Sequence, residues 1–244
     1  MDVAIVGPGR LGRSLDTLLR AQGVSVALCA RGERVPAADV TLLTVPDGAI
    51  AAVAKELAPG RVVLHCAGSL GVEALRPHRP AGTLHPLMSF PGPEVSIPDL
   101  RGVGAAVSGD PEACQLAETL CAHLGLIPLT ITGDRRLYHA AAVLAGNFAT
   151  VLLADATRLL VAAGADPEHA ASTLAPLALA SIRGALPEPI SGLTGPAARG
   201  DLVTIAAHRE ALSSGGFSAL LRSYDALTER AKSLAGTIDE TESV

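Results

Sequence analysis

The stretch VAIVGPGRLG, residues 3–12, decides the fold of this chain. Its first four residues are apolar without alternation, which is typical of a parallel strand that is covered on both faces. The next six residues hold glycines in the G-x-G-x-x-G spacing, and a segment with leucines at 11, 15, 18 and 19 overlaps and follows them. A strand, a glycine turn and an amphipathic helix in this order predict a dinucleotide-binding unit.

Each glycine of the turn has a physical task. Gly7 permits the tight turn out of the strand, Gly9 lets the backbone approach a pyrophosphate, and Gly12 lets the helix lie against the strand. The first N–H groups of the helix and the positive end of its dipole then face the phosphates. The alternative is a glycine turn with a structural duty alone. The expected cofactor contacts of the turn are Gly7, Pro8, Gly9, Arg10, Leu11 and Gly12.

The end of the second predicted strand indicates which nucleotide binds. Residues 24–29 form this strand, and an NAD site would place Asp or Glu just after it, on the ribose 2′-hydroxyl. The chain has Arg31 there, which suits a 2′-phosphate and predicts NADP (NADPH) as the cofactor. Two alternatives stay open: Arg31 as a solvated turn residue, and Glu33 as a displaced ribose ligand. Val45 and Pro46, after the third predicted strand, complete the expected cofactor contacts.

Length, charge and cysteine content exclude several classes of protein. The 244 residues suffice for two domains, and a formal net charge of −5 argues against a nucleic-acid partner, which would require a basic face. The four cysteines have no C-x-x-C spacing, which is typical of reduced core residues. No charged leader precedes the first strand, and the nearly uncharged segment 140–154 is too short to span a bilayer. We therefore expect a cytoplasmic protein without a membrane partner.

Strand and helix patterns alternate up to about residue 132 and then give way to helices alone. The alternation predicts an α/β Rossmann domain over residues 1–132, with a doubly wound, mostly parallel sheet. Residues 133–244 are expected to form an all-helical domain for substrate binding and dimerisation, with a cleft between the two domains. Residues 237–244 are expected to be a frayed tail. The predicted helices span residues 134–163, 167–186, 201–213 and 217–235.

The first of these helices, residues 134–163, indicates an oligomer. Polar side chains interrupt it rarely, and a helix that is apolar almost all the way round must be covered on most sides. One small domain can hardly cover it, so the sequence predicts a homodimer through the helical domain.

Polar residues at strand ends and on the long helix are the candidates for chemistry. Ligands in open α/β sheets bind beyond the carboxyl ends of the strands, where His65 and His85 are expected. His139 and Asn147 lie a little over two helical turns apart and therefore share a face. We expect His139 to donate a proton, Asn147 to polarise the substrate, and His85 to approach from the sheet side. The alternative for each is a polar group satisfied within the protein.

A second group of candidates lies further along the chain. Arg199 could bind a substrate carboxylate, and Asp201 is expected to cap the helix that follows it. His208, on that helix, is more typical of a surface residue.

Six ordered motifs give the chain a resemblance to a known family over nearly its whole length. It resembles the Rossmann-like oxidoreductases whose C-terminal half is a domain of unknown function, in the wider group of 6-phosphogluconate dehydrogenase, pyrroline-5-carboxylate reductase and ketopantoate reductase. The resemblance implies NAD(P)-dependent oxidoreductase activity on a small carboxylated substrate, and a homodimer built on the helical domain. The motifs are GPGRLG (7–12), LTVPDGAI (43–50), VLHCAGSLG (63–71), LHPLMSF (84–90), YHAAAVLAGNF (138–148) and LTGPAARGD (193–201).

The chain departs from this group at one position. Many relatives carry a catalytic lysine four residues before the helix asparagine, where this chain has Val143. Either His139, one turn earlier, takes the role of the lysine, or the chemistry differs. The leading hypothesis is an NADPH-dependent reductase of a 2-oxo acid such as ketopantoate. The alternatives are an imine reductase of the pyrroline-5-carboxylate type and a non-catalytic NAD(P)-binding sensor.

Overall fold

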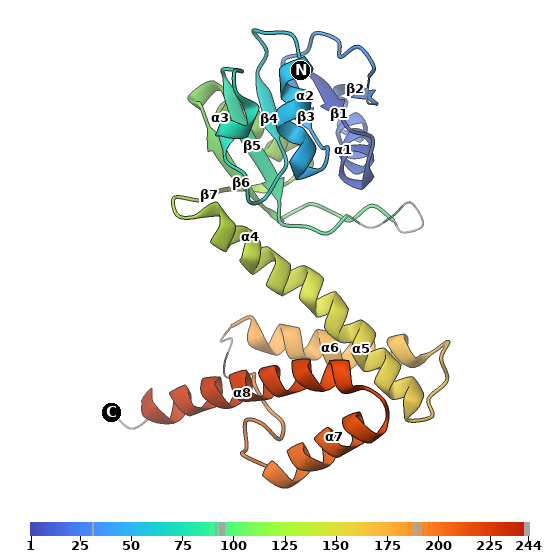
Figure 1. Ribbon diagram of the computed structural model, residues 1–244. Coiled ribbons are helices and arrows are strands. Elements are labelled where there is room, and N and C mark those ends of the chain that lie inside the picture. Colours follow the sequence, from blue (N-terminus) through green and yellow to red (C-terminus); the bar gives the residue numbers. More distant parts are fainter. Residues whose placement is uncertain (31, 91, 93–95, 188–189, 191, 242–244) are drawn as a thin grey trace. The chain divides into compact units, whose positions relative to one another are not determined.

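The computed structural model describes residues 1–244 except 31, 91, 93–95, 188–189, 191 and 242–244 (Figure 1). The chain divides into two compact units, Met1–Phe148 and Ala149–Val244. The first unit holds a sheet with its helices, and the second is helical.

Seven strands form one sheet in the order β2-β1-β3-β4-β5-β6-β7. Only β5 and β6 pair antiparallel, and every other neighbouring pair is parallel. The prediction of a doubly wound, mostly parallel sheet is therefore confirmed. The strands are β1 (Asp2–Val6), β2 (Ser25–Cys29), β3 (Val40–Leu43), β4 (Val63–His65), β5 (Ala81–Pro86), β6 (Gly104–Gly109) and β7 (Ile127–Thr130).

Helices cover both faces of this sheet and bury one hydrophobic cluster on each. Helices α1 (Arg10–Ala21) and α3 (Pro111–Leu124) pack on one face, and α2 (Ile50–Glu56) packs on the other. Because both faces are covered, β1 from Val3 to Val6 is fully buried, as its unbroken apolar run predicts. The short helices η1 (Asp47–Ala49) and η2 (Val72–Leu75) follow β3 and β4. The carboxyl ends of β1, β3, β4 and β5 therefore meet at one edge.

A continuous helical stretch, Arg135–Ala162, runs through the boundary between the two units. It consists of α4 (Arg135–Val143), a π-helical turn η3 (Leu144–Phe148) and α5 (Ala149–Ala162). The sequence places a domain boundary at 132, after the last strand, whereas the first compact unit extends to Phe148 because α4 and η3 belong with the sheet.

The nearly uncharged segment 140–154 was expected to be too short to span a bilayer, but the helical stretch that contains it is longer. At 28 residues it is long and apolar enough to cross a membrane by length and composition alone, and none of its apolar window is buried. The core helix of a soluble protein can be as long and as apolar, but it is mostly buried. Because this stretch is exposed in the single chain, we expect its apolar surface to be covered by other groups.

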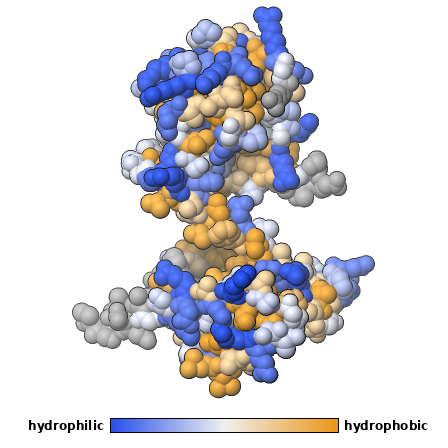
Figure 2. Space-filling model, viewed as in Figure 1, coloured by the Kyte–Doolittle hydropathy of each residue, from blue (hydrophilic) through white to orange (hydrophobic). Residues whose placement is uncertain are grey.

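The helical unit contains α5, α6 (Ala170–Ala185), α7 (Leu202–Ser214) and α8 (Ser218–Thr241). The expected frayed tail from residue 237 is wrong up to Thr241, because no glycine or proline follows Gly236 to end the helix. Several large apolar side chains of this unit are exposed, among them Leu177 at 66% and Val203 at 82%. Figure 2 shows such hydrophobic side chains at the surface beside charged ones.

Candidate active site

The glycine turn after β1 has the close contacts that its sequence predicts. Gly7 has a φ of +112°, a conformation that side chains other than hydrogen disfavour, and a Cβ there would lie 2.9 Å from Cγ1 of Val45. A Cβ on Gly12 would lie 2.1 Å from the carbonyl oxygen of Gly7. Thr44 donates its hydroxyl hydrogen to that same oxygen at 2.7 Å. The turn is therefore packed tightly against the end of β3, where Pro46 is exposed.

The space around Gly9 is open, in contrast to Gly7 and Gly12. A Cβ on Gly9 would meet no atom within 4 Å. Helix α1 begins at the next residue, Arg10, without a side-chain cap and without an acidic residue in its first turn. The free N–H groups and the positive end of the helix dipole can therefore receive a phosphate. These residues fit the pyrophosphate of a dinucleotide, with Leu11 packed toward the core behind them.

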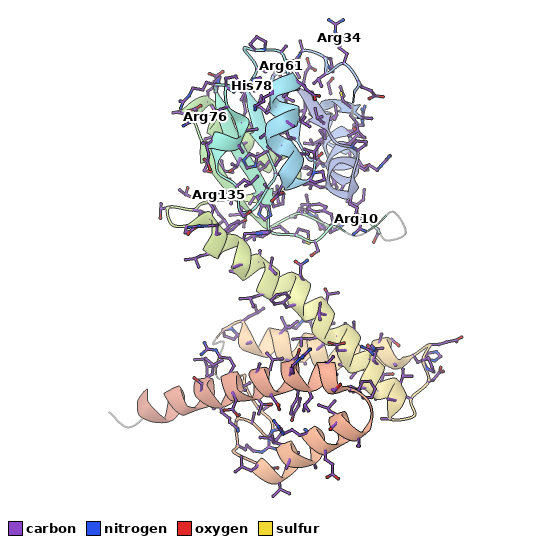
Figure 3. The ribbon with its side chains drawn as sticks, viewed as in Figure 1. Arg10, Arg34, Arg61, Arg76, His78 and Arg135 are labelled. Carbon is purple, nitrogen blue, oxygen red and sulfur yellow. The ribbon has the colours of Figure 1, made fainter. Side chains whose placement is uncertain are left out.

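The end of β2, where the cofactor preference is expected, is described only in part. Arg31 lies outside the described residues. Glu33 is exposed, and one of its carboxylate oxygens accepts the N–H of Ala30 at 2.7 Å. The structure thus gives Glu33 a role in closing its own turn. Figure 3 shows Arg34 at the far end of the sheet unit from Arg10.

A pocket of about 590 Å³ lies between the end of β5 and the α4–η3 helix, within the sheet unit. His85 and Ser89 line it from the β5 end, and His139 and Asn147 line it from the helix. The sequence-predicted catalytic residues are therefore brought to one cavity. Val143, at the position of the lysine in related enzymes, also lines it.

Gly68, after β4, allows the two pocket histidines to approach each other. A Cβ at this position would lie 2.3 Å from Cδ2 of His139 and 2.9 Å from Nε2 of His85. The two imidazole rings meet edge to face, with centroids 5.8 Å apart. In the sequence Gly68 lies three residues after His65, whereas its approach to His85 and His139 depends on tertiary packing and has no local pattern.

Tyr138 belongs to the site beside His139, and the sequence, which places this pair at the start of the long helix, assigned it no role. Its hydroxyl oxygen lies 2.7 Å from Nδ1 of His85, and both residues line the pocket. Burial is the main cause that lowers the pKa of His85 to about 4, and the charges of His139, Arg135 and His65 lower it further. His85 is therefore neutral near pH 7 and cannot serve as an imidazolium acid.

Arg135, in the first turn of α4, provides the positive charge behind this site. Its guanidinium donates to the Ser108 hydroxyl at 3.2 Å and to the carbonyl oxygen of Ala67 at 3.3 Å. Among the described residues its buried Nε has no hydrogen-bond partner, and burial lowers the pKa of Arg135. Figure 3 shows Arg135 near the start of α4. Because Ser108 is on β6 and Ala67 is in the loop after β4, both far from Arg135 along the chain, the sequence carries no signal for these contacts.

His65 has a structural role, which is the alternative that the sequence analysis left open for it. The side chain is fully buried, and its Nδ1 accepts the N–H of Ala67 at 3.2 Å. Nε2 must then carry the hydrogen and donate it to the Gly71 carbonyl at 3.1 Å. Burial lowers the pKa of His65, so it stays neutral and holds the loop that contains Gly68.

The candidates further along the chain lie in the helical unit. Asp201 caps α7, as predicted, by accepting the Thr204 N–H at 3.0 Å. His208 is exposed, and its Nδ1 lies 2.8 Å from the hydroxyl of Tyr224. Arg199 is exposed. These residues form their own contacts within that unit.

Comparison with known proteins gives a family match and several similar structures. Residues 103–231 match the family model described as a domain of unknown function, DUF2520. None of the curated proteins matches the sequence.

Three solved structures illustrate the likeness of the fold. BF3122 from Bacteroides fragilis, named as an NADP oxidoreductase, is 21% identical with a TM-score of 0.81, over 95% of this chain and 98% of that one. Protein TM1727 from Thermotoga maritima is 24% identical with a TM-score of 0.69, over 97% and 99% of the two chains. The reductive aminase from Aspergillus terreus, in complex with NADPH and ethyl levulinate, is 19% identical with a TM-score of 0.69, over 98% and 99%.

Proposed function

The chain belongs to the DUF2520 family, and on that premise we propose that it is an NADPH-dependent oxidoreductase that reduces a small carbonyl or imine compound. One observation carries the proposal. The sheet unit holds both a glycine turn with open space beside a free helix N-terminus and a pocket with two adjoining histidines. The structural likeness to NADP oxidoreductases supports the same activity.

The turn at Gly9 and the N-terminus of α1 would hold the pyrophosphate, and Arg31 would bind the 2′-phosphate. NADPH, when bound, supplies a hydride. Glu33 is a weaker candidate for a ribose ligand, because its carboxylate accepts the N–H of Ala30. Replacing Arg31 by Asp should weaken NADPH binding more than NADH binding, and Arg34→Asp is the matched control because Arg34 lies away from the glycine turn.

The pocket residues divide the work of reduction between them. His139, partly exposed in the pocket, is proposed as the general acid that gives a proton to the substrate oxygen or nitrogen. Asn147, exposed on η3, would hydrogen-bond and orient the same group. His85 is neutral and contributes as a hydrogen-bonding group. Val143 cannot titrate, so no lysine acts at that position.

The substrate class is proposed as a small 2-oxo acid such as ketopantoate, or an imine of the pyrroline-5-carboxylate type. None of the side chains that line the described pocket is Lys or Arg, so a substrate carboxylate would need a cation from elsewhere in the protein. An imine without a carboxylate would need no such cation.

A homodimer is proposed to cover the apolar surface of the helical unit. Exposed leucines, isoleucines and valines on α5, α6 and α7 are more than a soluble monomer usually presents, and a second copy of the same surface can bury them. In this proposal the protein works in the cytoplasm, without a membrane or nucleic-acid partner.

The activity is tested by following NADPH oxidation with 2-oxo acids, ketones and cyclic imines. Turnover that depends on His139 would support the reductase. Tight NADPH binding without turnover of any member of the panel would instead support the alternative, a non-catalytic sensor, for which the absence of a lysine at Val143 is the specific observation.

A further inference from the structure

The Tyr138 hydroxyl makes two contacts with the same residue. Its oxygen lies 2.7 Å from Nδ1 of His85, and the hydroxyl donates to the His85 carbonyl oxygen at 3.3 Å. A tyrosine hydroxyl has one hydrogen, and a carbonyl oxygen can only accept. Both contacts are hydrogen bonds at the same time only if His85 carries its hydrogen on Nδ1 and donates it to the Tyr138 oxygen.

The second ring nitrogen of His85 then carries a lone pair. Nε2 lies 2.9 Å from the point that a Cβ of Gly68 would occupy, next to the ring of His139. In the described part of the chain, Nε2 makes no hydrogen bond. The charged or titratable groups that act on the ring are His139 and Arg135 from α4 and His65 from β4, and all of them favour the neutral form. A neutral ring with Nδ1–H leaves Nε2 as an acceptor.

We infer that Tyr138 is a positioning residue that holds His85 in the Nδ1–H form, so that Nε2 accepts a hydrogen bond from the substrate and selects a protonated imine over a ketone. The inference rests on the proposed function and narrows its substrate class. A protonated imine nitrogen carries a hydrogen that can point at Nε2. A ketone oxygen carries lone pairs alone, which would face another lone pair.

The bond changes agree with an acceptor at this position. When a hydride adds to the carbon of a protonated imine, the π electrons of the C=N bond become the nitrogen lone pair and the product is an amine. His139 would supply the proton that converts the neutral imine to the protonated imine, and that hydrogen then stays on nitrogen while the hydride adds. A ketone needs a hydride on carbon and also a proton on oxygen; His139 could give that proton, but the ketone oxygen would still have no hydrogen to share with the Nε2 lone pair before the hydride adds.

The tautomer can be measured without any turnover. In protein labelled with ¹⁵N-histidine, long-range ¹H–¹⁵N spectra distinguish Nδ1–H from Nε2–H, and His85→Gln assigns the signal. We expect Nδ1–H in the wild type and a shift toward Nε2–H in Tyr138→Phe. Tyr224→Phe is the matched control, because it removes the same kind of contact from His208. An Nε2–H signal for His85 in the wild type, or no change in Tyr138→Phe, would overturn the inference.

Selection is measured with two saturated five-membered rings, pyrrolidine and tetrahydrofuran, added with NADP⁺. Protonated pyrrolidine has N–H donors and the ether has none, so we expect pyrrolidine to bind at least about tenfold more tightly. Its binding should move the His85 Nε2 resonance, and Tyr138→Phe should reduce the preference at least about fivefold. Equal binding of the two rings would overturn the inference. If no substrate oxidises NADPH, the proposed reductase activity is contradicted. The His85 tautomer and the preference for pyrrolidine over tetrahydrofuran can still be measured in that case.

Discussion

Gly68 and His139 approach so closely that a Cβ on Gly68 would lie 2.3 Å from Cδ2 of His139. Gly68→Ala must therefore displace the His139 ring or the loop after β4. We expect turnover to fall at least about a hundredfold, the range for loss of a general acid. Gly133→Ala is the control, because its Cβ would meet no atom within 4 Å. Kinetic constants and the melting temperature of both variants check this, and near-normal turnover of Gly68→Ala would show that the approach is not needed.

Because the space beside Gly9 is open, a substitution there should weaken cofactor binding without affecting folding. Gly9 has no positive φ, and a Cβ there would touch nothing, so Gly9→Ala should fold with a melting temperature close to that of the wild type. The added methyl would stand where the pyrophosphate must approach, and we expect the Kd for NADPH to rise at least about tenfold. Gly12→Ala is the contrast, since its Cβ would lie 2.1 Å from the Gly7 oxygen and should lower stability as well. Fluorescence titration with NADPH measures the affinity, and an unchanged Kd in Gly9→Ala would contradict the cofactor site.

Local signals made much of the fold predictable. The bounds of α3 follow from local signals, because Pro111 suits the first turn of a helix and Gly125 ends the helix with a φ of +71°. The unbroken apolar run of β1 likewise predicted a strand buried on both faces. The antiparallel pairing of β5 with β6 left no such local mark, since it depends on the path of the chain between them.

The sequence predicted the histidines of the candidate site but not the contacts that these histidines make. His85, His139 and Asn147 were found because polar residues at strand ends and on an apolar helix stand out. The contact of Tyr138 with His85 joins residues 53 positions apart, and the sequence carries no pattern for it. The π-helical turn that contains Asn147 was missed for a related reason, because its residues suit an α-helix equally well.

The lowered pKa values of His65 and His85 predict a loss of stability in mild acid. Both histidines are neutral in the folded protein, whereas in the unfolded chain they take up protons as the pH falls below about 6.5. The unfolded state then binds more protons, so the free energy of unfolding falls with pH, by up to about 1.4 kcal/mol per pH unit for each histidine. For His85 this fall continues until its folded pKa of about 4.

Urea unfolding at pH 7 and at pH 5 measures the predicted fall in the free energy of unfolding. Asp99 and Asp134, whose pKa values are lowered to about 2, stay ionised in the folded state and largely so in the unfolded state over that interval. His85→Gln should therefore show a smaller difference between the two pH values than the wild type. His208→Gln, a change at an exposed histidine of α7, is the matched control. Identical differences in His85→Gln and the wild type would mean that His85 is not held neutral.

The exposed apolar surface of the helical unit predicts dissociation when a charge is placed on it. Leu152, on α5, is 43% exposed in the single chain, and Leu152→Lys should break the proposed homodimer or cause aggregation. Light scattering at micromolar concentration should give about twice the chain mass for the wild type. Glu210→Lys, an exposed charge change on α7, should leave that mass unchanged. A stable wild-type monomer, or a wild type that partitions into membranes, would contradict the dimer.

The division of roles between His139 and Asn147 predicts unequal losses of rate. Both line the pocket, but His139 is proposed to supply a proton and Asn147 a single hydrogen bond. His139→Ala should lower kcat by at least about a hundredfold, while the Kd for NADPH stays nearly unchanged because the glycine turn is intact. Asn147→Ala should lower kcat less. The measurement is steady-state turnover of the best substrate, under conditions where a deuterated NADPH shows that hydride transfer limits the rate. If His139→Ala keeps near-normal turnover under those conditions, the histidine is structural. The site of chemistry would then have to be sought among His85 and the residues that follow it.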